Sequence, residues 1–456
     1  MKARIGVIGL WLLWGCQPPP PTPAKSSADT LVVTTKAPLP PVRPQPDTFW
    51  TDLARLLGGL PPQDSTRWAA VLRDTTWQLY ARRLQYLWEQ RQKSLYDSLI
   101  VWAARELEPY HTWKGLVFYP FSGADWPTVY AVYPHGSTYI LFGLEQEGDP
   151  HYLRTLSPQE IPPHLQGPYG ALADLLRLTF FKTKDMQTQL AHGKLRGLLP
   201  VFLALFARTG HAIYKVEHII LQEGGRIDTL SASQKKPPQS CWDNPITGLR
   251  FRVGRSPEAL QEVIYLSLNA ADAGLKTQTG SYAFLSRLAP CVTLIKSASY
   301  LLFSPEFSEM RRLILTQSVG ILQEDTGIPY RFFDTTAWRI ALYGSYTQPI
   351  PLFRSKYQQD LWEAYRRLPV KPLPFGIGYH IYPAQSNLLW AVRRDPTAVL
   401  PPLPEDVPPP SKPMPTRPVP SLLSPDTTPR LPAPTPLPDS LLRDSAATAV
   451  PSSGSE

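Results

Sequence analysis

Five charged side chains stand inside or beside strongly apolar stretches of the sequence, where a charge is unusual. They are Asp125, Asp185, Arg208, Lys296 and Arg331. Burying a charge is costly unless a partner compensates it, so each residue must reach the surface, pair internally or line a cleft. We predict that the five line one charged cleft, in which a carboxylate such as Asp125 or Asp185 does acid–base chemistry. Internal ion pairs and surface positions stay open as alternatives.

Two further patterns resemble sites for a catalytic nucleophile, although the sequence contains no GxSxG elbow. Ser122 lies in YPFSGAD, three residues before Asp125, and we interpret this segment as a tight turn in which one of the two side chains caps the next segment. Thr293 and Lys296 have SxxK spacing, with Thr in place of Ser. That motif begins a helix in serine hydrolases, whereas this segment has the pattern of a strand. Neither pattern therefore predicts a nucleophile.

The sequence indicates neither a metal site nor a cofactor. Its eight histidines form no HxH, HxxxH or HExxH pattern. Glu217 and His218 are neighbours on a predicted strand, so their side chains point to opposite faces and cannot chelate one ion together. The glycine-containing segments match neither GxxxxGK[ST] nor GxGxxG. We predict no metal and no cofactor.

The amino-terminal residues predict export and a lipid anchor. Two basic residues precede an apolar run that ends at Trp14, which is the build of a signal peptide over residues 1–15. The run is shorter than the roughly 20 residues that cross a bilayer. It leads into Leu13-Trp14-Gly15-Cys16, which resembles the lipobox of bacterial lipoproteins, although Trp14 departs from the usual small residue. The resemblance implies cleavage before Cys16 and acylation of its thiol. The alternative is an ordinary signal with an incidental cysteine.

The two other cysteines, Cys241 and Cys291, would meet an oxidising compartment in an exported chain. They are candidates for a disulfide, and the sequence does not decide whether they pair.

Proline divides the chain into a folded region and two flanks. Of the 53 prolines, ten lie in residues 17–47 and seventeen in residues 401–456. Such segments cannot form helices or bury enough apolar surface to fold. We therefore expect a lipidated, proline-rich linker over 16–47, a globular domain over 48–400 and a disordered tail over 401–456. The net charge of +9 forms no dense basic run, so nucleic acid is not an expected partner.

Residues 48–400 alternate between helical and strand-like patterns. Helical spacing covers 77–102, 168–192 and 198–210, and further helix starts are expected at Ser304-Pro305 and at the Ser-x-x-Gln box of 355–358. Strand-like runs lie at 115–123, 137–145, 213–230, 249–254, 262–269, 291–295 and 373–383. The elements are interleaved without a strict βαβ rhythm. This order predicts an α+β, or mixed α/β, fold in one integrated domain that begins with a helical segment.

Several phrases of the folded region together resemble an uncharacterised family of exported bacterial proteins. They are VFYPFSGAD, TYILFGLE, FFKTKDM, LFARTG, IKSASYLL, GIPYRFF and LPFGIGY, and they extend from about Leu116 to Trp390. The resemblance implies one integrated domain and carries no activity.

Two functions are consistent with these patterns, as hypotheses. The first is a lipid-anchored envelope lipoprotein, facing the periplasm from the outer membrane, that binds or scaffolds an envelope protein or a glycan. The second is an envelope hydrolase that uses carboxylates in the charged cleft. The sequence does not decide whether the chain is an enzyme.

The lipid anchor is directly testable. In cells fed a clickable fatty acid, we expect the wild-type chain to carry the label and Cys16→Ser to lack it, because only the thiol accepts the diacylglycerol. A labelled Cys16→Ser chain, or a mature wild-type chain that keeps its first fifteen residues, would contradict the anchor.

Overall fold

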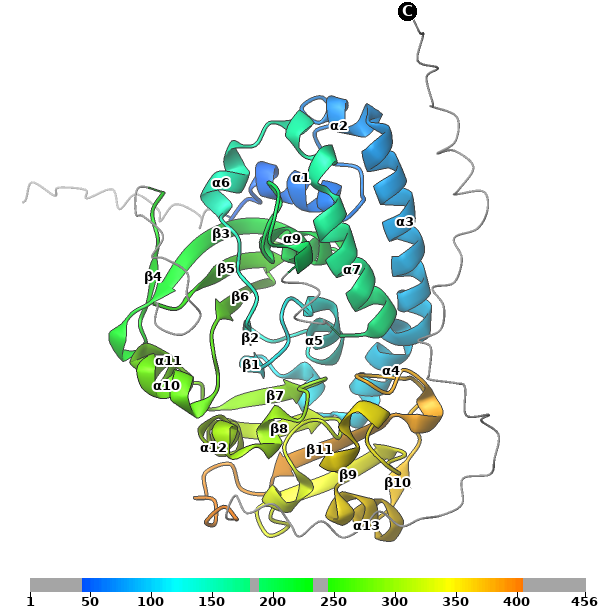
Figure 1. Ribbon diagram of the computed structural model, residues 1–456, viewed down its shortest axis with the longest axis vertical. Helices are drawn as coiled ribbons and strands as arrows, with labels where there is room; N and C mark the ends of the chain where they lie inside the picture. Colours follow the sequence, from blue (N-terminus) through cyan, green and yellow to red (C-terminus); the bar gives the residue numbers. More distant parts are fainter. Residues whose placement is uncertain (1–42, 181–187, 233–244, 405–456) are drawn as a thin grey trace, which may run out of the picture. The chain divides into compact units, whose positions relative to one another are not determined.

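A single mixed sheet runs through the computed structural model, which describes residues 43–180, 188–232 and 245–404 (Figure 1). The described residues contribute eleven strands, in the spatial order β10-β9-β11-β8-β7-β1-β2-β6-β5-β3-β4. In chain order the strands are β1 (Leu116–Tyr119), β2 (Thr138–Gly143), β3 (Ala212–Leu221), β4 (Ile227–Thr229), β5 (Thr247–Gly254), β6 (Leu260–Ser267), β7 (Cys291–Ile295), β8 (Ser318–Gln323), β9 (Trp338–Gly344), β10 (Val370–Lys371) and β11 (Asn387–Arg393).

The centre of the sheet is parallel and its two sides are largely antiparallel. Strands β8, β7, β1, β2 and β6 are parallel neighbours. Next to β8, strand β11 is antiparallel to both β8 and β9. Next to β6, strand β5 is antiparallel to both β6 and β3. Together with the helices, this mixed sheet confirms the predicted α+β class.

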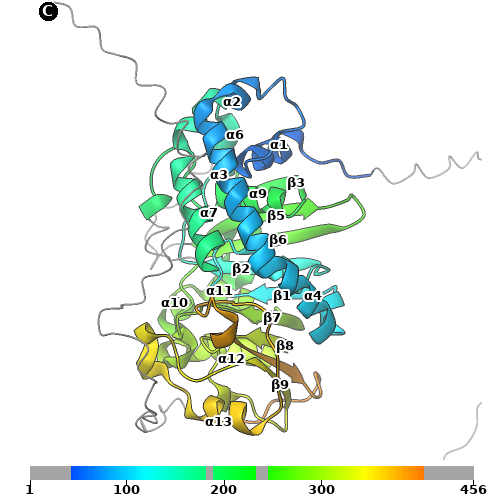
Figure 2. The ribbon, with the colours of Figure 1, turned by 90° about the vertical axis from the view of Figure 1, so that its right-hand side faces the viewer.

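Helices cover both faces of the sheet (Figure 1 and Figure 2). They are α1 (Thr48–Leu57), α2 (Ala69–Arg73), α3 (Thr75–Arg91), α4 (Asp97–Glu106), α5 (Trp126–Val132), α6 (Pro150–Thr155), α7 (Gln166–Leu178), α9 (Leu199–Arg208), α10 (Asp272–Thr277), α11 (Thr279–Leu285), α12 (Ser308–Gln317) and α13 (Gln359–Arg367). Within the described ranges, none of these helices is long and apolar enough to cross a bilayer.

The two faces of the sheet belong to two separate apolar cores. Successive side chains of a strand point to opposite faces, and in β1 Val117 and Tyr119 join one core while Phe118 joins the other. The first core contains apolar residues of α1, α3, α4, α5, α7 and α9, and the second contains those of α10 to α13. Because both faces are covered, the central strands are buried throughout, as is usual for parallel strands.

The long amphipathic segment predicted over 77–102 is one continuous helical stretch. Helix α3 passes through a π-helical turn at Gln92–Tyr96 into α4. Helix α7 lies beside α3 (Figure 1 and Figure 2). The Arg91 guanidinium of α3 donates to the carbonyl oxygens of Leu176 and Arg177 at 2.5 and 2.6 Å. These carbonyls lie in the last turn of α7, where backbone acceptors have no partner within the helix. Arg91, on α3, therefore caps the carboxyl end of α7.

Two local predictions are wrong. The expected last strand at 373–383 is a loop with one isolated bridge, between Ile377 and His380, and the last strand is β11. The expected capping box at 355–358 does not begin a helix, because Ser355 lies in the 3-10 turn Pro351–Lys356 and α13 starts after Gln358. In both segments the local pattern is present, but tertiary contacts decide the outcome.

Strand β10 forms one edge of the sheet and is shielded by its neighbours in sequence. It is only two residues long and exposed, and Pro369 and Pro372 flank it. Proline has no amide hydrogen to donate, so the edge offers few groups to another strand.

The core beneath α9 provides a test of the packing. Phe206 is fully buried, and its ring lies 5.2 Å from Trp126 and 5.0 Å from Phe251 between centroids. We expect Phe206→Ala to lower the free energy of unfolding by about 3–5 kcal/mol, because it leaves a cavity among aromatic rings. Urea denaturation measures the change. Val101→Ala is the control, since Val101 also lies on a helix but is 65% exposed. An equal loss of stability in Val101→Ala would contradict the assignment of Phe206 to the core.

Candidate active site at the carboxyl edge of the parallel strands

The connections of the central strands diverge between β1 and β7. Strand β1 continues through α5 to β2 on one side, and β7 continues through α12 to β8 on the other. Helix α5 packs on one face of the sheet and α12 on the opposite face. In α/β sheets, ligands bind outside the carboxyl ends of the strands at such a switch point. A site is therefore expected at this edge of the sheet.

A buried ion pair joins the segments that come after β1 and β7. The Lys296 ammonium lies 2.5 Å from Oδ2 of Asp125, and both side chains are 2% exposed. The Asp125 carboxylate also accepts hydrogen bonds from the hydroxyls of Tyr119 at 2.7 Å and Thr128 at 2.8 Å. The ammonium donates to Thr128 Oγ1 at 3.2 Å and to the Thr179 carbonyl. With all three ammonium protons and both carboxylate oxygens in use, the pair has a structural role.

The other three predicted cleft residues do not join this pair among the described residues. Arg208 ends α9, and its guanidinium donates to the side chain of Gln85 on α3. Arg331 lies over the ring of Phe332, with 4.8 Å between the guanidinium carbon and the ring centroid. Asp185 lies outside the described residues. Of the five predicted residues, the structure thus brings together Asp125 and Lys296.

The segment after β1 is the tight turn expected at Ser122, but the expected cap is wrong, because neither Ser122 nor Asp125 caps the helix that follows. The Ser122 hydroxyl donates to the Tyr119 carbonyl at 2.8 Å and so closes the turn. Asp125 precedes α5, but its carboxylate does not cap that helix. The Asp125 carboxylate pairs instead with Lys296, so it accepts no hydrogen bond from the backbone amides of α5.

Cys291 and Thr293 lie within β7, as the strand pattern predicts. The Cys291 thiol is fully buried, 3.6 Å from the Gln317 carbonyl, and burial raises its pKa to about 11. Cys241 lies outside the described residues, so the disulfide stays a prediction.

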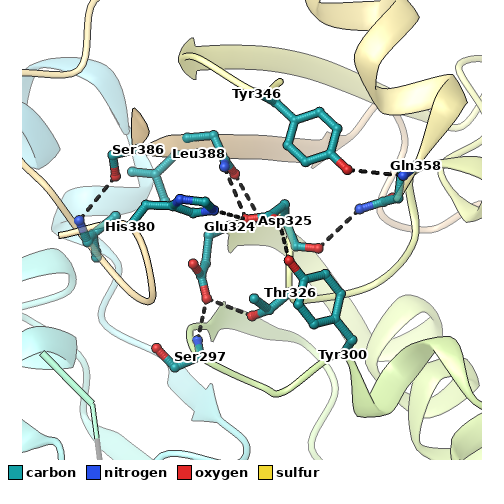
Figure 3. A network of polar contacts seen from close by, with 12 residues as sticks. Ser297, Tyr300, Glu324, Asp325, Thr326, Tyr346, Gln358, His380, Ser386 and Leu388 are labelled. Carbon is teal, nitrogen blue, oxygen red and sulfur yellow. Dashed lines mark hydrogen bonds and ion pairs between the residues drawn. The ribbon is translucent and has the colours of Figure 1, made fainter. Parts of the chain in front are cut away.

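A second buried polar network lies just after β8 (Figure 3). At its centre Asp325 accepts hydrogen bonds from the Tyr300 hydroxyl at 2.5 Å and from the Asn387 amide at 3.0 Å. Nε2 of His380 lies 3.2 Å from the same Asp325 carboxylate. The backbone amide of Asp325 donates to the Asn387 side chain at 2.8 Å. These contacts come from three separate segments and fix Asp325 in place.

Glu324, the preceding residue, has hydrogen bonds at only one of its two carboxylate oxygens. Oε1 accepts hydrogen bonds from the Ser297 amide at 2.5 Å and from the Thr326 hydroxyl at 2.6 Å. Oε2 is buried and has no hydrogen-bond partner among the described residues, and the same holds for the Ser297 hydroxyl. Buried polar atoms without partners are rare in native proteins and mark places where water or a ligand binds.

Burial and the contacts within this network shift the pKa values of three of its residues. Burial raises the pKa of Glu324 to about 7, and the nearby Asp325 charge contributes to the rise. Burial alone would lower the pKa of His380, but its contact with Asp325 outweighs that effect and raises it. Burial and Asp325 hold the pKa of Tyr300 far above its ordinary value, so its hydroxyl stays a donor. Glu324 is therefore able to take up and release a proton at neutral pH.

Backbone strain concentrates at this same edge. The described residues include five non-glycine residues with positive φ, at +51° to +67°, namely Phe121, Thr179, Ser297, Ser299 and Tyr300. Phe121 comes after β1, and Ser297, Ser299 and Tyr300 come after β7. The carbonyl of Thr179 accepts from Lys296. Such conformations cost about 1–3 kcal/mol each and cluster at functional sites, so they point to the same place as the unpaired atoms.

A small pocket lies beside the network. Its lining includes Glu324, Asp325, Gln358 and Asn387, and it has room for about one water molecule. In the described part of the chain, no group of three or more His, Cys, Asp or Glu side chains is placed to hold a metal ion.

Glu324, Asp325 and His380 were not among the residues predicted for a site. One signal was present. The run Val319–Leu322 is followed by Gln323 and then by four residues, two acids with Thr326 and Gly327, which is typical of a polar turn at the end of a buried strand. His380 has no such local signal, because it joins the site from a loop.

Comparisons with known proteins found no match, whether among protein-family models, curated proteins or solved structures. The site must therefore be interpreted from its own chemistry.

The buried pair gives a prediction of stability. We expect Lys296→Met to lower the free energy of unfolding by about 3–5 kcal/mol, because it leaves the Asp125 charge buried without its cation. Combined with Asp125→Asn, the loss should be smaller than the sum of the two single losses, as urea denaturation would show.

Lys194→Met provides the matched control. It removes the same group from an exposed pair with Glu160 and should change stability much less. Additive losses in the double variant would show that the two buried residues do not act as a pair.

Proposed function

We propose that the protein is a lipid-anchored protein of the cell envelope whose folded region is a hydrolase, with Glu324 as its general base. The observation that carries the chemistry is the Glu324 carboxyl group. It is buried, has one oxygen without a partner and has a pKa of about 7. A group that titrates near neutral pH at the carboxyl edge of a parallel sheet is suited to proton transfer.

The step that this group supports is the attack of water on a bound substrate. The ionised Glu324 takes a proton from a water molecule through Oε2 while the water oxygen forms a bond to the substrate. The bond to the leaving group then breaks, and the same proton passes from Glu324 to the leaving group. The hydrogen bonds from Ser297 and Thr326 hold Oε1 and so orient the free oxygen.

Asp125 is the less suitable carboxylate for this role. Lys296, Tyr119 and Thr128 occupy both of its oxygens. Asp325 is likewise held by Tyr300, Asn387 and His380. The two carboxylates have other roles. Asp125 connects the ends of β1 and β7 through Lys296, and the charge of Asp325 helps raise the pKa of Glu324.

A binding or scaffolding role is the second candidate. The observation that favours it is the small size of the pocket beside the network, which has room for about one water molecule. Under this alternative, the unpaired atoms hold a ligand without turnover, and an envelope protein is a further partner.

The proposed location rests on the sequence. The lipobox at Cys16 and the proline-rich linker favour a domain held away from a membrane surface. Gln17 is not the Asp that retains some lipoproteins at the inner membrane, which favours the outer membrane facing the periplasm.

The proposal predicts the behaviour of Glu324→Gln. When the full-length chain is incubated with isolated cell envelopes, mass spectrometry should detect soluble products, and Glu324→Gln should release them about 10²–10⁴ times more slowly. In the wild type the rate should rise with pH through about 7, because only the ionised Glu324 accepts a proton.

Glu223→Gln serves as the control, since Glu223 is exposed and outside the network. It should match the wild type in rate and pH profile. A Glu324→Gln variant that keeps the wild-type rate would eliminate the proposed base. If a correctly folded wild type releases nothing, the binding role is favoured.

A further inference from the structure

We infer that the ligand of this site is a neutral carbohydrate chain, held on an aromatic surface formed by Phe180, Phe353 and Tyr379. The hydrolysis of that chain rests on the proposed function, whereas its binding does not. Three features point to such a ligand: the aromatic side chains, the polar atoms next to them and the charge balance of the site.

The three rings of the aromatic surface come from different segments and meet at Tyr379. The ring of Tyr379 lies 4.6 Å from that of Phe180 and 5.7 Å from that of Phe353, between centroids. All three side chains are half-buried, and the neighbouring Leu352 is 80% exposed. Part of each ring is thus open to solvent. The apolar C–H face of a sugar ring packs against an aromatic ring in this setting.

The aromatic surface adjoins the unpaired atoms of the candidate active site. Tyr379 comes directly after Gly378, which touches Glu324 so closely that a Cβ atom there would lie 2.2 Å from Oε2. The Tyr379 hydroxyl pairs with Ser299 Oγ at 2.7 Å and donates to the Ser297 carbonyl at 3.3 Å. The hydroxyl end of the Tyr379 ring thus lies at Ser297, whose own buried hydroxyl has no hydrogen-bond partner among the described residues.

Charge disfavours an anionic ligand. The two cationic groups that contact the networks at this edge are already paired, Lys296 with Asp125 and His380 with Asp325. Glu324 contributes a further negative charge once it ionises. A phosphate or carboxylate group placed here would face this carboxylate without a compensating cation from these two networks.

The unpaired atoms suit hydroxyl groups. Glu324 Oε2 is an acceptor, and the Ser297 hydroxyl both donates and accepts. A sugar hydroxyl likewise donates and accepts, and it carries no charge. The combination of an open aromatic face with such groups is what a carbohydrate requires, since one side of the sugar ring is apolar and its rim is polar.

The test is binding of neutral oligosaccharides to the full-length chain in detergent. The probes are chitotetraose, maltotetraose and cellotetraose, measured by isothermal titration calorimetry. We expect at least one probe to bind, and Tyr379→Ala to weaken that binding about tenfold or more. Tyr382→Ala is the matched control, because Tyr382 lies in the same loop and is 54% exposed, and its affinity should equal that of the wild type.

The outcomes separate the two proposals. Binding that Tyr382→Ala retains and Tyr379→Ala loses supports the carbohydrate site, whether or not the probe is cleaved. Binding without cleavage of any probe or envelope glycan leaves the site intact and overturns the hydrolase. If no oligosaccharide binds, or if tetramethylammonium binds instead in a Tyr379-dependent way, the carbohydrate inference is wrong, since rings and a carboxylate also suit an organic cation.

Discussion

The structure depends on one buried ion pair, Asp125 with Lys296, which connects the ends of β1 and β7 where the connections of the sheet diverge. The register between these two strands ends at Phe118 and Thr293, so the segments beyond need another link. The pair provides it from inside the protein, and Tyr119, Thr128 and the Thr179 carbonyl complete its hydrogen bonds. A buried ion pair offsets the cost of desolvation only when further hydrogen bonds satisfy both charged groups, as they do here. Because every hydrogen-bonding group of the pair is used within the protein, Asp125 and Lys296 hold the strand ends together and do not themselves act on a ligand.

The strained backbone after β7 lies directly beside this ion pair. After Lys296 the chain passes through left-handed conformations at Ser297, Ser299 and Tyr300. These conformations persist because their surroundings hold them: Glu324 accepts from the Ser297 amide, and Asp325 accepts from the Tyr300 hydroxyl. The same contacts that hold the loop also bring Oε2 of Glu324 and the Ser297 hydroxyl to the edge of the sheet, where neither has a partner among the described residues. Strain and unpaired atoms are thus two results of one arrangement, which is the usual sign of a pre-organised site.

Much of the fold, and less of the site, can be predicted from the sequence. The helix around Trp77 has clear helical periodicity, whereas the helix around Phe206 and the strands β1, β2, β5 and β7 are recognisable as apolar runs bounded by turn residues. The segment 373–383 has strand composition, yet contacts with Glu324 and Ser386 hold it as a loop. Asp125 and Lys296 were identifiable as charges in apolar surroundings. Their pairing, and the convergence of Glu324 with His380, depend on contacts between distant segments that no local pattern encodes.

The short strand β10 has a consequence for how copies of the chain behave when they are crowded. A sheet covered by helices on both faces exposes its backbone only at its margins, and such a margin invites sheet-to-sheet association. Pro369 and Pro372 flank a margin of two residues, so an approaching strand would find too few amide donors to build a ladder. This margin therefore acts as a steric and chemical stop that keeps neighbouring molecules from polymerising through it.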